Sequence, residues 1–340
     1  MAGIEAVAKL AGVSIATVSR ALSGKGNVSE RARTKVQEAA AQLGYIASSS
    51  AYTLATGRNR NIGVVVPVID RWFFSTILQA VETELIEHGY DVTLYNLSGG
   101  EKQRRRIFNE FLRRQRVDGV LTVAVQPSPE ELEQLTKVGK PIVGAGGRIP
   151  GARSLVMNDY SAGKLAVEHL ISLGHKKIAI IGAEPQADAE FHQPAERYRG
   201  YLAALTEHGL EHHDYWRFEC EFTIEAGYNA TKQLFGDPLK APTAIFCYAD
   251  ELAYGAMMAV RDLGMRVPED ISIVGIDNHD MANFYGLTTV DQRVREQGQE
   301  IAKMMLAVLE DPDAPINVEL QRDWDFELIV RGSTARPASK

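Results

Sequence analysis

The sequence predicts a small all-α headpiece followed by a larger α/β core of two Rossmann-like lobes. Three observations support this fold class. Apolar residues recur at helical spacing, with glycine breaks, through the first 46 residues. From about residue 61, Val/Ile-rich strands alternate with helices, and this alternation runs twice. A chain of 340 residues is long enough for two or three domains.

In the headpiece, the apolar pattern predicts a helix over Ile4–Ala11. Gly12 follows, where glycine tolerates the left-handed backbone that ends a helix. Ser14 is placed to cap a second helix, Ile15 to about Leu22, and Ser29 caps a third. Two short helices joined by a tight turn form a helix-turn-helix, whose second helix enters the major groove of DNA.

The charge is unevenly distributed along the chain. The net charge is −7, but residues 1–60 hold eight Lys/Arg against three acidic residues, which leaves +5 there and −12 on the rest. A basic head on an acidic body is expected when only the head meets phosphates. A chance fluctuation in a short window is the alternative.

The core pattern predicts parallel sheets with helices on both faces. Strands are expected at 62–66, 91–95, 119–125, 141–144, 177–182, 243–247 and 271–275. Helices are expected at 75–88, 101–116, 129–138, 161–173, 195–208, 224–235 and 251–263. Ligands of open α/β sheets bind beyond the carboxyl ends of the strands. Two such units therefore predict a periplasmic-binding-protein-like clamp with a ligand cleft between its lobes.

Other classes of protein are disfavoured by what the sequence lacks. It has no apolar run of about 18 residues and no signal-peptide pattern, and its two cysteines form no disulfide framework. We expect a cytoplasmic protein without membrane contact, and not a transport component. No dinucleotide-binding or nucleophile motif is present, so we expect no enzyme activity and no cofactor. The cluster His208, His212 and His213 favours a surface loop over a metal site.

An arginine-rich stretch at residues 104–116 could suggest a second DNA-binding patch. It shares its predicted helix with acidic and apolar residues such as Glu101 and Ile107. This mixture favours a solvated helix face.

Several motifs together resemble the LacI/GalR (lac-repressor) family of transcriptional regulators. In the headpiece they are Val7–Ser14, Ala16–Arg20, Leu22–Gly24, Val28–Ser29 and Leu43–Tyr45. In the core they are His169–His175, Arg197 with Gly200-Tyr201, Asp250-Glu251, Val267–Asp277 and Leu287–Gln292. The headpiece departs from the family pattern at Gly3, where a capping Thr or Ser is usual, and at Ala6, where an acid is usual.

The resemblance implies a sequence-specific DNA-binding regulator, by default a repressor. The residues implied to bind DNA are Ser14, Ile15, Ala16, Thr17, Ser19, Arg20, Tyr45 and Leu54. Arg20 can pair with a guanine, and Ile15 and Ala16 can touch thymine methyls. The hydroxyl groups would donate to phosphates. Two alternatives stay open, namely that Ile15 belongs to the headpiece core and that Arg20 only holds a phosphate.

Residues 47–60 resemble the hinge segment of the family. The segment is too short to form a stable helix alone. The resemblance implies that it becomes helical on DNA, where Leu54 wedges into the minor groove. A plain Ser-rich linker is the alternative.

The resemblance also implies an effector site between the lobes. Its predicted residues are Asp70, Arg71, Trp72, Phe73, Asp159, Arg197, Phe222, Asp277 and Gln292. Residues 70–74 are expected to form a loop that points into the cleft, although its aromatic residues could instead be a core stripe. Aromatic rings can stack on a sugar or a base while polar groups fix its orientation. We favour a sugar over a nucleobase.

The family further implies a homodimer that reads a near-palindromic operator. The predicted domains are 1–46 for the headpiece, 47–60 for the hinge, 61–158 with 292–322 for one lobe, and 159–291 with 323–340 for the other. A helix from about residue 293 to 309 would return the chain to the first lobe. Whether the effector releases or tightens DNA is left open. The alternatives are a phosphoprotein co-repressor and a sugar-binding protein that binds no DNA.

Overall fold

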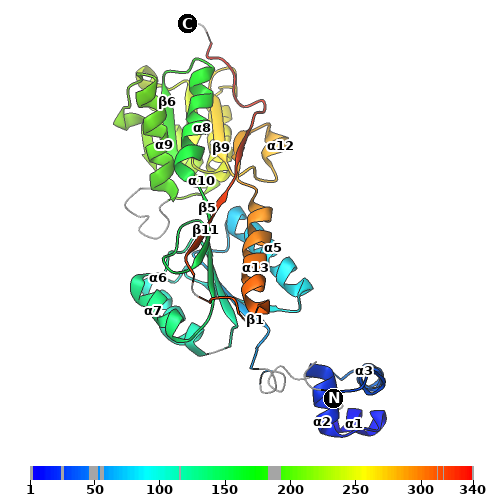
Figure 1. Ribbon diagram of the computed structural model, residues 1–340. Helices are drawn as coiled ribbons and strands as arrows, with labels where there is room; N and C mark the ends of the chain where they lie inside the picture. Colours follow the sequence, from blue (N-terminus) through cyan, green and yellow to red (C-terminus); the bar gives the residue numbers. More distant parts are fainter. Residues whose placement is uncertain are drawn as a thin grey trace. The chain divides into compact units, whose positions relative to one another are not determined.

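The computed structural model describes residues 3–23, 27–45, 53, 57–114, 116–182, 193–311, 313–316 and 318–338 (Figure 1). It divides into two compact units. The first comprises residues 1–61 with 115–118, and the second comprises 62–114 with 119–340.

The headpiece is a three-helix unit formed by α1 (Ile4–Ala11), α2 (Ile15–Ser23) and α3 (Glu30–Leu43). Its core is formed by small and β-branched side chains, among which Val7, Val18 and Val36 are fully buried. The three predicted helices are therefore confirmed, with their ends within a residue or two of the prediction.

The helix ends in the headpiece follow the predicted capping chemistry. Gly12 adopts the left-handed backbone after α1. The Ser14 hydroxyl accepts a hydrogen bond from the amide of Thr17 at 3.1 Å, and that of Ser29 accepts one from Ala32 at 3.3 Å. The N-terminus of α1 has no side-chain cap, because Gly3 stands where a hydroxyl would accept.

The first lobe of the core is built on a six-stranded sheet in the order β11-β5-β4-β3-β1-β2. Its strands are β1 (Asn61–Val66), β2 (Asp91–Asn96), β3 (Gly119–Val123), β4 (Ile142–Ala145), β5 (Arg153–Met157) and β11 (Leu320–Trp324). Parallel pairing joins β1 to β3, β3 to β4, β4 to β5 and β5 to β11. Full burial of β3 and β4 explains why these strands lack alternating polarity.

The second lobe repeats this plan with the order β12-β10-β9-β8-β6-β7. Its strands are β6 (Ile178–Gly182), β7 (Arg217–Glu219), β8 (Ala244–Cys247), β9 (Ser272–Ile276), β10 (Thr288–Asp291) and β12 (Glu327–Ile329). Only β12 runs antiparallel to its neighbour among the pairings of this sheet in the described residues. The predicted class of two Rossmann-like lobes is confirmed.

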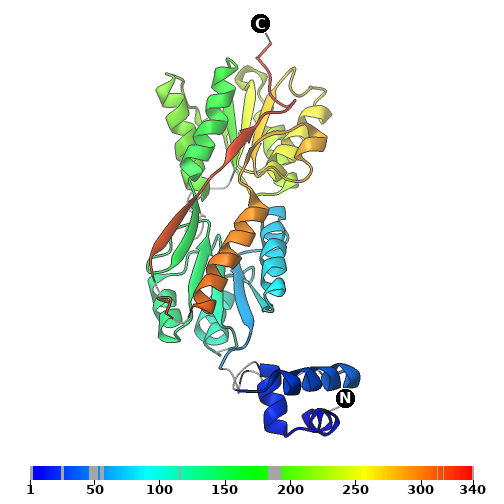
Figure 2. The same ribbon diagram turned by 45° about the vertical axis from the view of Figure 1, so that its right-hand side comes forward.

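Helices cover the two sheets, as Figures 1 and 2 show. In the first lobe they are α5 (Trp72–Glu87), α6 (Gly100–Arg106), α7 (Pro129–Lys137) and α13 (Val294–Glu310). In the second lobe they are α8 (Asp159–Ser172), α9 (Gln193–Glu207), α10 (Ile224–Leu234), α11 (Asp250–Asp262) and α12 (Ala282–Tyr285). Short 3₁₀ turns lie at Asp214–Trp216 and Pro238–Lys240. Helix pairs α5 with α13, α8 with α9, and α10 with α11 pack side by side.

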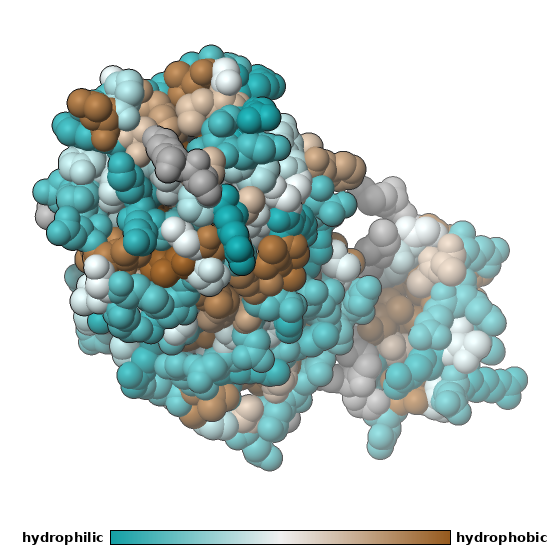
Figure 3. All heavy atoms as spheres, turned by 90° about the horizontal axis from the view of Figure 1, so that it is seen from above, coloured by the Kyte–Doolittle hydropathy of each residue, from teal (hydrophilic) through white to brown (hydrophobic). Residues whose placement is uncertain are grey.

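The chain passes between the lobes three times. It crosses from β5 to α8, from β10 to α13, and from β11 to β12. Figure 2 shows α13 against the first lobe and the long C-terminal stretch running along both lobes. Seen from above, hydrophilic residues cover most of the surface, with hydrophobic residues gathered in patches (Figure 3).

Two sequence predictions about the first lobe are wrong. The aromatic run Trp72–Phe74 is not a loop, because α5 begins at Trp72 and takes these residues into its first turn. The helix expected over 101–116 changes character at Ile107, where a π-helical stretch (Ile107–Phe111) and a 3₁₀ turn (Leu112–Arg114) follow α6.

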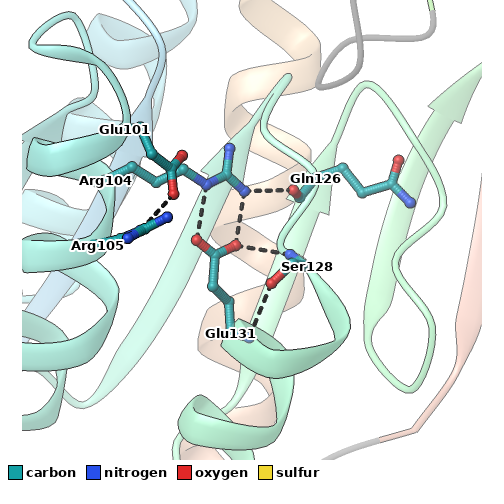
Figure 4. Close-up of polar contacts among 6 residues, drawn as sticks. All are labelled: Glu101, Arg104, Arg105, Gln126, Ser128 and Glu131. Atoms are coloured by element: carbon teal, nitrogen blue, oxygen red, sulfur yellow. Dashed lines mark hydrogen bonds and ion pairs between the residues drawn. The ribbon is translucent and has the colours of Figure 1, made fainter.

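The arginine-rich stretch is also not a uniformly solvated face, since Arg104 is buried. Its guanidinium donates to both carboxylate oxygens of Glu131, at 2.8 and 2.7 Å, and to the carbonyl of Gln126 at 2.8 Å (Figure 4). The Glu131 carboxylate also accepts from the amide of Ser128, which completes a capping box at the start of α7. Arg104 therefore joins α6 to the segment between β3 and α7.

We expect Arg104→Met to destabilise the core strongly, because it leaves the Glu131 side chain, which is 12% exposed, without its ionic partner. Loss of one member of a buried pair costs about 3–5 kcal/mol. Denaturant unfolding of the full chain measures this change. Arg105→Met is the matched control, because the Arg105–Glu101 pair is exposed and such pairs contribute about 1 kcal/mol or less. Equal losses in the two variants would contradict this account.

Candidate functional site

The outward face of α2 carries most of the residues predicted to contact DNA. Ser14, Ile15, Ala16 and Arg20 are exposed. Ile15 keeps 47% of its surface exposed, whereas Val18, about one turn further along α2, is fully buried. The alternative that Ile15 belongs to the headpiece core is therefore wrong. An exposed isoleucine is available for apolar contact with a partner.

The polar groups of this face are held by short-range hydrogen bonds. The hydroxyls of Ser14 and Thr17 lie 2.9 Å apart. The Nε of Arg20 donates to the carbonyl of Ala16 at 3.2 Å, one turn earlier on the helix. Ser19 is half-buried, and Tyr45 packs against the headpiece core. Leu54 and most of the predicted hinge, 47–60, lie outside the described residues.

A cavity of about 250 Å³ lies between the two lobes of the core. Residues from both lobes and from the crossovers line it: Pro67, Val68, Arg71, Phe73, Phe74, Ala124, Gly146, Met157, Asp159, Gln193, Pro194, Arg197, Phe222, Ala249, Glu251, Asp277, Gln292 and Gln297. Its lining combines three phenylalanines and small apolar groups with a few charged and amide side chains. Small-molecule sites in proteins have this composition.

Seven of the nine predicted effector residues line this cavity, namely Arg71, Phe73, Asp159, Arg197, Phe222, Asp277 and Gln292. Asp70 and Trp72 do not. Because α5 begins at Trp72, the helix turns this side chain away from the cavity. Its ring instead lies 4.6 Å from that of His279, and its Nε1 donates to Asp280 at 3.1 Å.

The remaining lining residues were missing from the predicted set, and among them Phe74, Gln193, Glu251 and Gln297 have large aromatic, acidic or amide side chains. Phe74 stood in the predicted aromatic run, and a helical reading of that run would have included it. Glu251 follows Asp250 in one of the core motifs that resemble the LacI/GalR family. Gln297 carried no sequence signal, because it lies on α13, which returns to the first lobe from the distant end of the chain.

A buried ion pair forms one wall of the cavity. Arg197 on α9 donates from Nε to Asp159, the first residue of α8, at 2.8 Å. Its Nη1 donates to the carbonyl of Tyr248. Burial raises the pKa of Asp159, and the charge of Arg197 opposes that shift. The cavity thus contains a guanidinium whose orientation is fixed by two acceptors.

Two further buried carboxylates stand beside this pair. Asp277 is 6% exposed and accepts a hydrogen bond from the amide of Gln292. Burial raises the pKa of Asp277 to about 7, although Arg197 opposes the shift. Behind it, Asp250 is fully buried and accepts from Thr289 at 2.7 Å and from the amide of His279 at 2.9 Å. Burial and the charge of Asp277 together raise the pKa of Asp250.

The two lobes touch each other around the cavity. From the first lobe, Arg71 donates to the carbonyl of Phe222, and Arg295 donates to Asp280 at 2.8 Å. From the second lobe, Gln193 donates to the carbonyl of Gly146. These contacts join the two lobes, so separation of the lobes would break them.

Within the described residues, no three His, Cys, Asp or Glu side chains form a group that could hold a metal ion. His212 packs against the rings of Tyr198 and Tyr201. None of the helices in the described ranges has both the length and the apolar character needed to span a membrane.

Family comparisons agree with this division of the chain. The model described as "Bacterial regulatory proteins, lacI family" matches residues 3–48, and that described as "Periplasmic binding protein-like domain" matches residues 167–334. A helix-turn-helix headpiece of the bacterial regulatory proteins joined to a two-lobed binding core is the plan of a bacterial transcription regulator. The chain belongs to the LacI family of these regulators.

Individual relatives support the same assignment. The HTH-type transcriptional repressor PurR of Vibrio vulnificus (strain CMCP6) is 32% identical over 99% of both chains. The lac repressor dimer bound to operator and the anti-inducer ONPF is 27% identical, with a TM-score of 0.81, over 98% of this chain and 99% of that one. The transcriptional regulator CelR in complex with cellobiose is 28% identical, with a TM-score of 0.69, over 98% of this chain and 100% of that one. This protein is a DNA-binding transcriptional repressor and not an enzyme.

The raised pKa of Asp277 predicts a pH dependence of stability. From its ordinary value of 3.8 up to about 7, folded Asp277 holds a proton that the unfolded chain has lost. The stabilisation that this proton gives the folded state is complete below about pH 3.8. It is lost as the pH rises through about 7. We expect the contribution of Asp277 to the free energy of unfolding to fall between pH 5 and 7, by at most ~1.4 kcal/mol per pH unit.

Denaturant unfolding at several pH values measures this slope. Asp277→Asn should flatten it, because the amide does not titrate and its oxygen can still accept from Gln292. Asp325→Asn, which removes an exposed carboxylate, is the matched control and should leave the slope unchanged. A slope in Asp277→Asn equal to that of the unchanged protein would count against the assignment.

Proposed function

We propose that a small effector, bound in the cavity between the lobes, controls the affinity of this repressor for its operator. The observation that carries the proposal is the cavity itself, where groups from both lobes line one space. A molecule that contacts both lobes binds their closed arrangement more tightly than an open one. It therefore shifts the population of the two arrangements, which is how binding at one site changes affinity at another.

The effector proposed is a sugar. Phe73, Phe74 and Phe222 offer aromatic faces, and Arg197 with its acidic neighbours offers fixed hydrogen-bonding groups. A sugar ring has apolar faces and a rim of hydroxyls, which fits this combination. Two structures of relatives contain a bound sugar. One is the CelR complex with cellobiose, and the other is a LacI family regulator from Enterococcus faecium with bound ribose, which is 29% identical, with a TM-score of 0.71, over 81% of this chain and 99% of that one.

On the DNA side, we propose that Ile15, Ala16 and Arg20 read bases and that Ser14, Thr17 and Ser19 hold phosphates, with Tyr45 and Leu54 completing the contact. The exposure of Ile15, Ala16 and Arg20 on α2 supports their base-reading role. We propose further that a homodimer reads a near-palindromic operator in the cytoplasm. We also propose that the boundaries between headpiece, hinge and the segments of the two lobes fall after residues 46, 60, 158, 291 and 322.

The first test selects binding sites from random-sequence duplexes with the purified full chain. We expect enrichment of a near-palindrome. Arg20→Ala should lose discrimination at one base pair of each half-site, worth about 1–3 kcal/mol. Arg31→Ala, an exposed arginine of α3, is the matched control, and it should at most weaken all sequences alike. Selection of the same site with the same discrimination by Arg20→Ala would refute the base-reading role.

The second test titrates the protein with ribose, cellobiose and adenine by calorimetry and measures operator affinity with each. We expect binding of a sugar that changes operator affinity, and a loss of about tenfold, or ~1.4 kcal/mol, in Phe222→Ala. Leu239→Ala removes a 90% exposed apolar side chain outside the cavity and serves as control. Binding of adenine without any sugar would replace the sugar assignment. Capture of a phosphoprotein from extract as the only modulator would favour the co-repressor alternative.

A further inference from the structure

The carboxylate of Asp118 holds the chain at the point where the linker ends. Asp118 is 6% exposed and immediately precedes β3. Its Oδ1 accepts from the backbone amide of Asn59 at 2.9 Å and from the side-chain amide of the same residue at 3.1 Å. Its Oδ2 accepts from the backbone amide of Arg60 at 2.7 Å. One carboxylate therefore fixes two successive backbone amides.

Backbone contacts continue this attachment on both sides. The amide of Asp118 donates to the carbonyl of Asn61 at 2.7 Å. The side chain of Asn61 donates to the carbonyl of Arg116 at 3.0 Å. Residues 59–61 and 116–118 are thus joined by a set of hydrogen bonds that we call the linker clasp.

The clasp also holds an unusual backbone conformation. Arg60 has a φ of 51°, in the left-handed region that residues with a side chain seldom adopt. Such a conformation persists only where the surroundings determine it. The bond from the Arg60 amide to Asp118 is one such determinant, because it points this peptide group at the buried carboxylate.

Chain connectivity gives the clasp its functional meaning. The last headpiece helix ends at Leu43, and β1 begins at Asn61. Any influence that travels along the backbone between headpiece and core must pass through residues 59–61. A loose attachment there would let each headpiece adopt many separations from its copy in a dimer.

We propose that Asp118 is a positioning residue for DNA recognition, which anchors the linker so that the two headpieces of a dimer match one half-site spacing. This inference rests on the dimer and near-palindromic operator of the proposed function. Dimeric helix-turn-helix proteins read half-sites at a fixed separation. Asp118 touches no base in this account and acts through residues 59–61.

An aspartate suits this role better than its amide. A carboxylate offers two accepting oxygens, which here take three donors, and bonds to a charged acceptor are the stronger kind. In Asp118→Asn, the new NH₂ group would take the place of one oxygen. It would face an N–H donor, with which it cannot form a hydrogen bond. We therefore expect the asparagine variant to lose part of the anchoring and the alanine variant to lose all of it.

The test measures spacing discrimination by the full-length protein. The selected operator is compared with versions whose centre is one or two base pairs longer. We expect the unchanged protein to lose tenfold or more in affinity on the altered spacings, and Asp118→Ala to lose less than threefold. The salt dependence of binding should stay the same, because the phosphate contacts are unchanged. If Asp118 only stabilised the fold, Asp118→Ala would lower the affinity for every operator spacing by the same factor.

Variants in the linker test the same bonds from the other side, should Asp118→Ala fail to fold. Arg60→Pro removes the amide donor and the left-handed conformation, and it should lose spacing discrimination. Arg60→Gly is the matched control, because it removes the same side chain but keeps the amide and tolerates the conformation. Asn59→Ala keeps both backbone donors and should retain discrimination.

The outcomes separate the inference from the function on which it rests. If the unchanged protein discriminates spacing and Asp118→Ala and Arg60→Pro discriminate equally well, the clasp has no positioning role. If the unchanged protein binds all spacings alike, the dimeric reading of a near-palindrome is itself wrong, and the inference is overturned with it.

Discussion

The cavity between the lobes depends on the buried ion pair of Arg197 and Asp159. Burial of an unpaired charge is costly, so each partner requires the other. Asp159 begins α8, directly after the chain crosses from β5, and Arg197 lies on α9. The pair fixes one crossover against the second lobe. Close packing makes this possible, since a Cβ on Gly163 or Gly200 would come within 2.6 or 2.1 Å of the facing helix backbone.

The acidic residues around this pair give the cavity a second property. Asp250 and Asp277 are both buried and near enough for the charge of one to raise the pKa of the other. Two such carboxylates resist full ionisation together. The site therefore joins a fixed guanidinium to buried acidic groups whose pKa values are raised.

Periodicity was sufficient to predict the headpiece and most of the core, because local patterns determine those elements. It missed β5, β7, β10, β11 and β12, which are short or partly exposed and are stabilised by partners distant in sequence. Residues 72–74 were misassigned for a related reason. An aromatic run fits a loop or a helix start equally well, and only packing against the first lobe turns Phe73 and Phe74 inward and Trp72 toward Asp280.

The sequence by itself determined the fold class, the capped headpiece helices and, through its motifs, the family of DNA-binding repressors. These follow from residue spacing and type, which act over a few positions of the chain. Only the tertiary structure decided which side chains share the cavity, that Arg104 is buried against Glu131, and that Asp118 holds the end of the linker. Arg104 and Glu131 are 27 positions apart in the sequence, and Asn59 and Asp118 are 59 positions apart. Such contacts are not visible in local patterns, because packing and hydrogen bonding act through space and not along the chain.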